Sequence, residues 1–307
     1  IPEEAARIYQ EKGFNFCIFT DHVGDWFFGG WFDPERKVGK KLTDYISIAG
    51  SELSCQVPNR YGRAVEVHIN TLGSRYPLIP LLSKDIVTEL NANIRMTWDH
   101  DAVPHVNHPN FLWSFDYHEL RQVDVPYLLE LVNACTSSYN FGDLSRPSME
   151  QTWDVLLSEG HRVYGTCADD AHYYYDYKPA ESAPGYGWVV CRVDELSREK
   201  VLTALRLGNF YASTGPELEE YAVDGRTIHV KVKAQDKQHF RIKFIGRHGG
   251  ILDEVEGLEA DYTIRGDEGY VRVRVGDDAA GSNGYDGVAG QILWCQPVFV
   301  EDIVRRE

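Results

Sequence analysis

FNFCIFTDH, residues 14–22, is a short apolar run that ends in Asp21 and His22. Residues 43–52, TDYISIAGSE, repeat this plan and end in Glu52. Short apolar runs bounded by polar residues are typical of buried β-strands. Later runs carry further acidic and imidazole side chains at or near their downstream ends, namely His68, His108, Asp170 and His172. We therefore predict a series of strands whose polar ends form a functional site.

Helical patterns alternate with these strands. Residues 2–13 begin with proline, carry acidic residues early and close at Gly13, as a short helix does. Further helices are predicted for residues 83–95, 148–160 and 197–210. Repeated β/α order favours a mainly parallel sheet that closes into a barrel. In such a barrel the C-terminal strand ends meet on one face, so that ligands far apart in the sequence converge.

A second domain is predicted after residues 213–217, STGPE, where a Gly-Pro pair ends the last helical unit. Beyond this point, strands separated by turns dominate, at residues 226–234, 240–246, 261–266, 270–276 and 292–300. This spacing is typical of a small β-sandwich. The chain of 307 residues is thus divided into residues 1–217, an α/β barrel, and residues 218–307, a β-sandwich that packs against it.

The composition argues against several classes of partner. A formal net charge of −16 and the lack of a basic stripe argue against nucleic-acid binding, because phosphate affinity depends on clustered Lys and Arg. No run of about eighteen apolar residues suggests a membrane span. We expect a small-molecule substrate, and oligomer formation is left open. The six cysteines are scattered without a CxxC pair, which favours free thiols, a reducing compartment and a cytoplasmic location.

Six side chains are candidate metal ligands. Asp170 and His172 are two residues apart, so both point to the same side of an extended strand end. A buried carboxylate such as Glu52 is costly unless it is paired or ligated, and a carboxylate can bridge two ions. Imidazole and carboxylate ligands suit Zn²⁺, Mn²⁺ and Fe²⁺ alike. The predicted ligands are His22, Glu52, His68, His108, Asp170 and His172. We assign the other histidines mostly to solvent or hydrogen-bonding roles.

An ordered set of motifs carries a resemblance to a known family, namely TDH at residues 20–22, GSE at 50–52, HINTLG at 68–73, NHP at 107–109 and ADDAH at 168–172. The chain resembles the PHP family, named for polymerase and histidinol phosphatase domains. The resemblance implies a distorted, TIM-like, seven-stranded β/α barrel, two or three metal ions and, in most members, phosphoesterase activity. GWVVCRV, ALRLGNFYASTGPEL and QPVFV resemble a branch in which this barrel precedes a β-sandwich and which includes carbamate hydrolases.

The resemblance also implies how the ligands are shared among three ions: His22 and His172 on one, Glu52, His68 and His108 on a second, and Glu52 and Asp170 on a third. The family's first strand supplies an HxH pair and a nearby aspartate that this chain does not contain. We expect these residues upstream of Ile1. Without them, only the second ion keeps its main protein ligands.

Catalysis would then use metal-activated water, with Glu52, Asp170 and His172 in catalytic roles and the ions stabilising developing negative charge. For the protonation of the leaving group, His172 and a nearby acid such as Asp169 are alternatives, and a liganded histidine is a poor proton donor.

Three residues are predicted to bind the substrate. Arg60 and Arg63 lie just before His68, and two guanidinium groups there suit a phosphate or carboxylate. Tyr173 follows His172 and is predicted to rim the pocket. The aromatic segment 25–32 is predicted to form a lid or wall over it. A solvated loop for the arginines and simple packing for the aromatic residues remain alternatives.

Three functions remain open on the sequence. A metal-dependent phosphoesterase that acts on a small phosphorylated substrate comes first. Hydrolysis of a carbamate, amide or ester at the same site comes second, and an apolar pocket without an arginine near the ions would favour it, because a neutral acyl substrate needs no anion clamp. A non-catalytic binding module with an incomplete metal site comes third.

Overall fold

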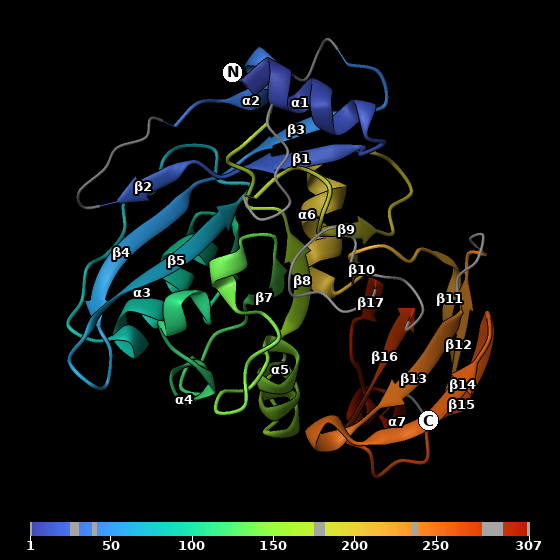
Figure 1. Cartoon of the computed structure of the whole chain (residues 1–307). Coiled ribbons are helices and arrows are strands. Elements are labelled where there is room, and N and C mark those ends of the chain that lie inside the picture. Colours follow the sequence, from blue (N-terminus) through green and yellow to red (C-terminus); the bar gives the residue numbers. More distant parts are fainter. Residues whose placement is uncertain are drawn as a thin grey trace.

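The structure is a computed structural model that describes residues 2–24, 31–38, 42–174, 182–234, 239–277 and 291–305. The helices predicted near the N-terminus and at residues 83–95, 148–160 and 197–210 are confirmed as α1, α3, α5 and α6 (Figure 1). The α-helices are α1 (Pro2–Glu11), α2 (Pro34–Lys37), α3 (Ile86–Asp99), α4 (Tyr117–Leu120), α5 (Met149–Ser158), α6 (Arg198–Leu207) and α7 (Val300–Val304). Short 3₁₀ turns are η1 (Phe111–Trp113), η2 (Thr136–Ser138) and η3 (Arg247–Gly249).

None of the helices in these described ranges is long and apolar enough to cross a membrane. None of the six cysteines, all of which lie in the described ranges, forms a disulfide, as predicted.

A mixed sheet forms the N-terminal part of the molecule, with strand order β2-β4-β5-β6-β7-β8. Its strands are β2 (His22–Gly24), β4 (Glu52–Pro58), β5 (Ala64–Leu72), β6 (Val103–Val106), β7 (Leu128–Asn133) and β8 (Tyr164–Ala168). The β4/β5 and β5/β6 pairs are antiparallel, whereas the β2/β4, β6/β7 and β7/β8 pairs are parallel. A separate parallel pair consists of β1 (Phe16–Phe19) and β3 (Ile46–Ala49).

The prediction of a seven-stranded β/α barrel is wrong. Helices make up 24% and strands 35% of the described residues, and the sheets are mostly antiparallel. One cause is the turn at residues 59–62, where the Asn59 side chain accepts hydrogen bonds from the amides of Tyr61 and Arg63. Gly62 adopts φ +75° there, which glycine does without strain. The chain therefore reverses directly from β4 into β5, with no helix between them.

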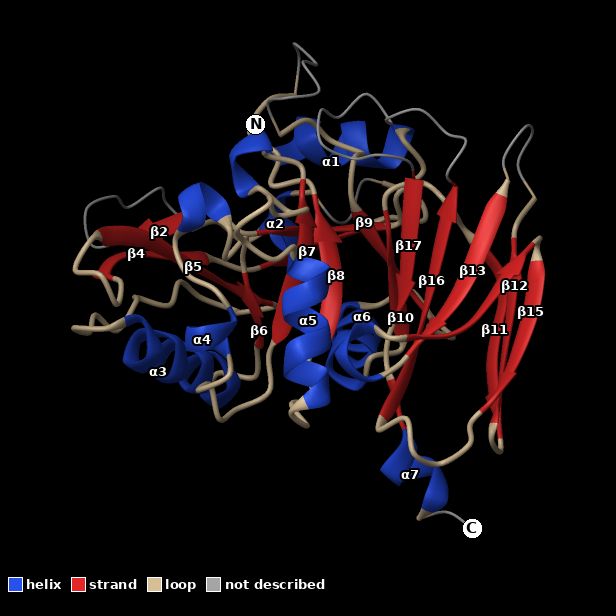
Figure 2. Ribbon diagram, turned by 60° about the horizontal axis from the view of Figure 1, so that its bottom comes forward, coloured by secondary structure: helices blue, strands red, loops and turns tan. Residues whose placement is uncertain are grey.

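The C-terminal part is built from antiparallel sheets (Figure 2). The larger sheet has the order β14-β13-β16-β17-β10-β9. Its strands are β9 (Trp188–Cys191), β10 (Phe210–Ser213), β13 (Phe240–Ile245), β14 (Ile251–Glu256), β16 (Tyr270–Asp277) and β17 (Gln291–Cys295), and β18 (Val298–Phe299) pairs with β16. The smaller sheet contains β11 (Leu218–Asp224), β12 (Thr227–Val232) and β15 (Glu259–Thr263).

The two C-terminal sheets share one apolar core, to which Val230 of β12, Phe244 of β13 and Val273 of β16 each contribute a fully buried side chain. Alternation in these strands sends one set of side chains inward and the other to solvent. Strands on both sides of residue 217 pair in the larger sheet, because β10 is hydrogen-bonded to β17. The boundary at residue 217 therefore falls between elements that are linked through one sheet.

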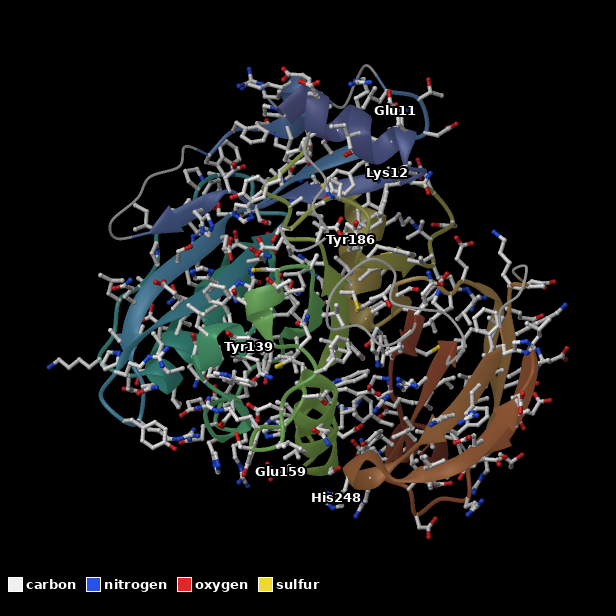
Figure 3. All side chains as sticks on the ribbon, viewed as in Figure 1. Glu11, Lys12, Tyr139, Glu159, Tyr186 and His248 are labelled. Atoms are coloured by element: carbon white, nitrogen blue, oxygen red, sulfur yellow. The ribbon has the colours of Figure 1, made fainter. Side chains whose placement is uncertain are left out.

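The two parts meet along α5. Figure 3 places Glu159, at the end of α5, close to His248 of η3, and the amide of His248 donates a hydrogen bond to Ser158 Oγ at 2.8 Å. Deeper in the same contact, Arg272 of β16 binds the carboxylate of Asp154 through two hydrogen bonds of 2.7 Å each. A buried ion pair of this geometry holds the two parts in one arrangement.

Candidate metal centre

Strand register brings three imidazoles to one carboxylate. His22 is the first residue of β2 and lies directly beside Glu52, the first residue of β4. On the other side, Ser54 of β4 is opposite His68 of β5, so His68 approaches Glu52 along the diagonal of the pair. His108 follows β6, whose partner strand is also β5. Thus Glu52 lies at the centre of residues from β2, β5 and the end of β6.

The distances at this cluster are short. Glu52 Oε1 lies 2.9 Å from His68 Nδ1 and 3.7 Å from His108 Nε2. Glu52 Oε2 lies 3.3 Å from His22 Nδ1. The rings of His68 and His108 are 5.1 Å apart, centroid to centroid. One carboxylate therefore contacts three histidines.

The alternation of the β4/β5 hairpin explains this arrangement. In β4, Leu53, Cys55 and Val57 are buried in the apolar core beneath α3. Side chains at the intervening positions point to the opposite face, since successive residues of a strand alternate. These are Glu52, Ser54 and Gln56 on β4 and Glu66, His68 and Asn70 on β5. The hairpin therefore has one apolar face and one face rich in potential ligands.

Glu52 and His68 form a buried ion pair. Burial alone would raise the pKa of Glu52, but the positive charge of His68 and the close approach of the His108 and His68 imidazoles outweigh it and hold this pKa well below its ordinary value. Burial likewise opposes the charged form of His68, and the charges of Glu52 and Glu66 raise the pKa of His68 to about 10. Each partner stabilises the ionised form of the other.

The donor set fits a divalent transition metal. Within the described part of the chain, His22, Glu52 and His68 each offer a ligand atom, and these atoms lie within 4.8 Å of one another. His68 Nδ1 is buried and makes no well-aligned hydrogen bond with any described group, although it faces Glu52. A buried nitrogen without a hydrogen-bond partner is costly. Coordination of an ion between the histidines and the carboxylate would satisfy it.

The other two predicted ligands lie beside this cluster. The His172 and His22 rings are 5.8 Å apart, centroid to centroid. Asp170 Oδ2 accepts a hydrogen bond from Asn133 Nδ2 at 3.3 Å. Asp170 has φ +50° and His108 has φ +26°, values that side chains other than glycine adopt only at a cost. Such strain is found preferentially at functional sites.

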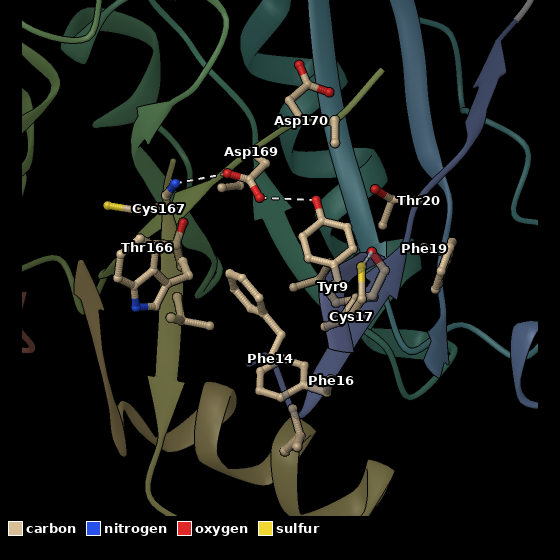
Figure 4. Close-up of a pocket in the computed structure, with 18 of the residues that line it drawn as sticks. Tyr9, Phe14, Phe16, Cys17, Phe19, Thr20, Thr166, Cys167, Asp169 and Asp170 are labelled. Carbon is tan, nitrogen blue, oxygen red and sulfur yellow. Dashed lines mark hydrogen bonds between the residues drawn. The ribbon is translucent and has the colours of Figure 1, made fainter. Parts of the chain in front are cut away.

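A cavity of about 1300 Å³ opens next to the cluster. Its polar end includes His22, Glu52, Asp170 and His172, and its other walls are largely aromatic and aliphatic, from β1, β9 and α6. Figure 4 shows Phe14, Phe16 and Phe19 among the aromatic side chains of these walls. No arginine is found among the described residues that line it. The cavity therefore combines a ligand-rich end with an apolar body.

Asp169 has a structural role. Its carboxylate accepts hydrogen bonds from the amides of Gly185, Tyr186 and Gly187 at 2.7 to 2.9 Å and from the Tyr9 hydroxyl at 3.1 Å (Figure 4). Burial raises the pKa of Asp169, and the amide donors act in the opposite direction. A carboxylate that accepts from four donors is bound in the manner of the ionised form. This arrangement argues against Asp169 as the proton donor and makes it an anchor for residues 185–187 and α1.

The two predicted substrate-binding arginines lie away from the cluster. Arg60 binds Asp116 at 2.7 Å and Glu119 at 2.8 Å, and Arg63 donates to the carbonyl of Leu112 at 3.0 Å. Both arginines follow the end of β4 at the hairpin tip, whereas Glu52 begins that strand. Six residues of strand span roughly 20 Å, and each guanidinium is engaged by these other partners.

The aromatic predictions are only partly described by the structure. Tyr173 is exposed beside His172, with a relative exposure of 53%. Residues 25–30 of the aromatic segment 25–32 and residues 175–177 of the run after His172 lie outside the described residues. Trp31 and Phe32 are half-buried, and Phe32 packs edge-on against Phe19 of β1.

Sequence reasoning missed the groups that hold the ligands. Glu130 of β7 accepts hydrogen bonds from the His108 amide at 2.6 Å and from Asn133 Nδ2 at 3.1 Å. Burial, followed by the charge of Asp170, raises the pKa of Glu130 well above its ordinary value. One signal was available, because a glutamate inside an apolar run such as YLLELVNA is costly unless it has partners.

His105 of β6 is one of the histidines for which we predict a solvent or hydrogen-bonding role, and it is buried. Nδ1 lies 2.7 Å from Asn107 Oδ1 and Nε2 lies 2.6 Å from Thr166 Oγ1. Burial is the main reason that the pKa of His105 is lowered to about 4. The folded protein therefore holds this imidazole neutral at neutral pH.

Acidification is expected to destabilise the protein through His105. The unfolded chain binds a proton near pH 6.5, whereas the folded chain binds it only near pH 4. The contribution of His105 to stability is thus complete above pH 6.5 and is lost as the pH falls toward 4. Between pH 7 and pH 5 the loss is about 2 kcal/mol. Urea unfolding at pH 7 and pH 5 measures the free energy of unfolding. Its decrease between the two pH values should be smaller in His105→Gln than in the wild-type protein, and an equal decrease in both proteins would contradict this account.

Comparison of the chain with protein-family models, with curated proteins and with solved structures found no match.

Proposed function

We propose that the protein is a metal-dependent hydrolase whose centre is Glu52. The observation that carries this proposal is the approach of His22, His68 and His108 to one buried carboxylate at 2.9 to 3.7 Å. Separate strands supply these residues, and burial makes such a cluster expensive unless it has a use. A large cavity beside the cluster offers space for a substrate.

Residues of the chain would bind the ion and form the walls of the substrate cavity. Glu52, His22, His68 and His108 would hold an ion, with Asp170 and His172 beside them as further ligands. A bound ion supplies Lewis-acid stabilisation of the negative charge that develops during hydrolysis. A substrate bound against the apolar walls would displace water from them, which strengthens electrostatic interactions at the reacting group. His172 is half-exposed at the rim of the cavity.

Phosphate esters are the first substrate class to consider, because the ordered set of sequence motifs resembles a family whose members are mostly phosphoesterases. The lack of an arginine among the described lining residues favours the second class, a carbamate, amide or ester. A neutral acyl group needs no guanidinium clamp, whereas a phosphate dianion in an apolar cavity needs positive charge, which Lys12 is the described lining residue to supply beside a bound ion.

Metal analysis of the full-length encoded protein, followed by hydrolysis assays with Zn²⁺ or Mn²⁺ present, tests the proposal. Phosphomonoesters, phosphodiesters and aryl carbamates are the substrates. We expect bound metal and turnover of one class, both strongly reduced in His108→Ala. His229→Ala is the matched control, because His229 also pairs with a carboxylate, Asp261 at 2.8 Å, but on β12.

The outcomes separate the three functions. Turnover of phosphate esters supports the first substrate class, and turnover of carbamates or esters alone supports the second. A protein that binds no metal and turns over none of the substrates contradicts the proposal and leaves a binding module. Turnover that is unaffected by His108→Ala contradicts the placement of the centre at Glu52.

A further inference from the structure

A line of hydrogen bonds leads from β8 through β6 to the central carboxylate. Thr166 Oγ1 lies 2.6 Å from His105 Nε2, and His105 Nδ1 lies 2.7 Å from Asn107 Oδ1. Asn107 Nδ2 donates to Glu52 Oε1 at 2.8 Å. The hydrogen bonds of Thr166, His105 and Asn107 thus form a continuous line that ends on Glu52 Oε1. This is the oxygen that faces both His68 and His108.

The charge of Glu52 sets the direction of this line. A carboxylate only accepts hydrogen bonds, so Asn107 must present its amide nitrogen to Glu52 and its amide oxygen to His105. His105 must then carry its proton on Nδ1, which leaves Nε2 free to accept from the Thr166 hydroxyl. The alternative acceptor for that hydroxyl, the Leu129 carbonyl, is farther away at 3.3 Å. A single tautomer and a single amide orientation satisfy all three contacts.

Burial makes the line difficult to replace. The relative exposures are 3% for Glu52, 3% for His105, 4% for Asn107 and 4% for Thr166. Water therefore has little access to a donor or acceptor that loses its partner, and an unpaired buried polar group is costly. The neutral state of His105 agrees with the direction of the line, because only a neutral ring has an unprotonated nitrogen that accepts from the Thr166 hydroxyl.

We propose that Thr166, His105 and Asn107 are positioning residues that orient the Glu52 carboxylate for metal binding. Asn107 holds Oε1 between His68 and His108, which leaves Oε2 beside His22. The proposal rests on the proposed metal centre and adds to it the groups that orient its central ligand. Partners behind a ligand of this kind typically change metal affinity by about 10- to 100-fold when they are removed.

The test compares two substitutions at Thr166. Thr166→Val keeps the shape of the side chain and removes the hydroxyl, whereas Thr166→Ser keeps the hydroxyl. We expect Zn²⁺ affinity, measured by competition with a chromophoric chelator, to fall about 10-fold or more in Thr166→Val and in Asn107→Ala and to be near wild type in Thr166→Ser. Thermal unfolding checks that each variant is folded. Equal affinities in the Val and Ser variants would overturn the proposal.

A second measurement needs no metal. Nitrogen-15 NMR of the histidine rings in the metal-free protein should find the His105 proton on Nδ1 in wild type and in Thr166→Ser. We expect Thr166→Val to change the His105 Nε2 resonance, because its donor is gone. If His105 carries its proton on Nε2 in the wild-type protein, the proposed direction of the hydrogen-bond line is refuted even if metal binds. Failure of wild type to bind Zn²⁺, with the expected His105 tautomer, would refute the proposed function and leave the hydrogen-bond line intact.

Discussion

Glu52→Gln is expected to lower the affinity for Zn²⁺ or Mn²⁺ by at least about 100-fold. Glutamine has nearly the same size as glutamate, so the packing of β4 is kept while the negative charge is removed. Glu52 is the carboxylate that contacts His22, His68 and His108. Loss of a group behind a ligand alone costs about 10- to 100-fold, and loss of the ligand itself should cost more. Chelator competition at constant pH measures the effect.

Glu66→Gln provides the matched control. Glu66 lies on the same face of the hairpin, and its Oε2 is 3.5 Å from His68 Nε2. It contacts the nitrogen of His68 that faces away from Glu52, so its removal should weaken binding by only about 10-fold. A larger loss of metal affinity in Glu66→Gln than in Glu52→Gln would show that the ion is not bound by Glu52.

Arg272→Met is expected to destabilise the protein by about 3 to 5 kcal/mol. The Arg272 side chain is 1% exposed and binds both carboxylate oxygens of Asp154, while its Nη2 lies 2.8 Å from Glu150. The guanidinium also lies over the ring of Trp153, 5.0 Å from its centroid. Methionine fills similar space but leaves two acidic groups without this buried positive partner. The free energy of unfolding, from denaturant titration at neutral pH, reports the loss.

Arg274→Met is the control for this prediction. Arg274 is two residues further along β16 and contacts the same Glu150, at 3.4 Å. Its side chain is 21% exposed, so solvent screens the interaction and the expected loss is under about 1 kcal/mol. Similar losses in the two variants would show that the arginine stems, and not the buried charge pair, carry the stability.

The local elements were predictable because their signals lie within a few residues. Asp85 caps α3 through the amide of Thr88, and Ser148 and Gln151 form a reciprocal cap at the start of α5. Such signals act over one helical turn. The alternation in β4 and β5 was likewise present in the sequence, although the run 43–52 was interpreted as one strand that ends at Glu52. The chain instead leaves β3 at Ala49 and begins β4 at Glu52.

The amino-acid sequence by itself determined which side chains could serve as ligands and which strand faces are apolar, since both are properties of single residues and their spacing. Only the tertiary structure decided that β4 and β5 form an antiparallel hairpin, that Arg60 is bound by Asp116 and Glu119, and that Thr166 is linked to Glu52. The physical reason is that local periodicity specifies which face of a strand is buried but not which strand lies beside it. Pairing depends on contacts between distant segments, and the site is made from those contacts.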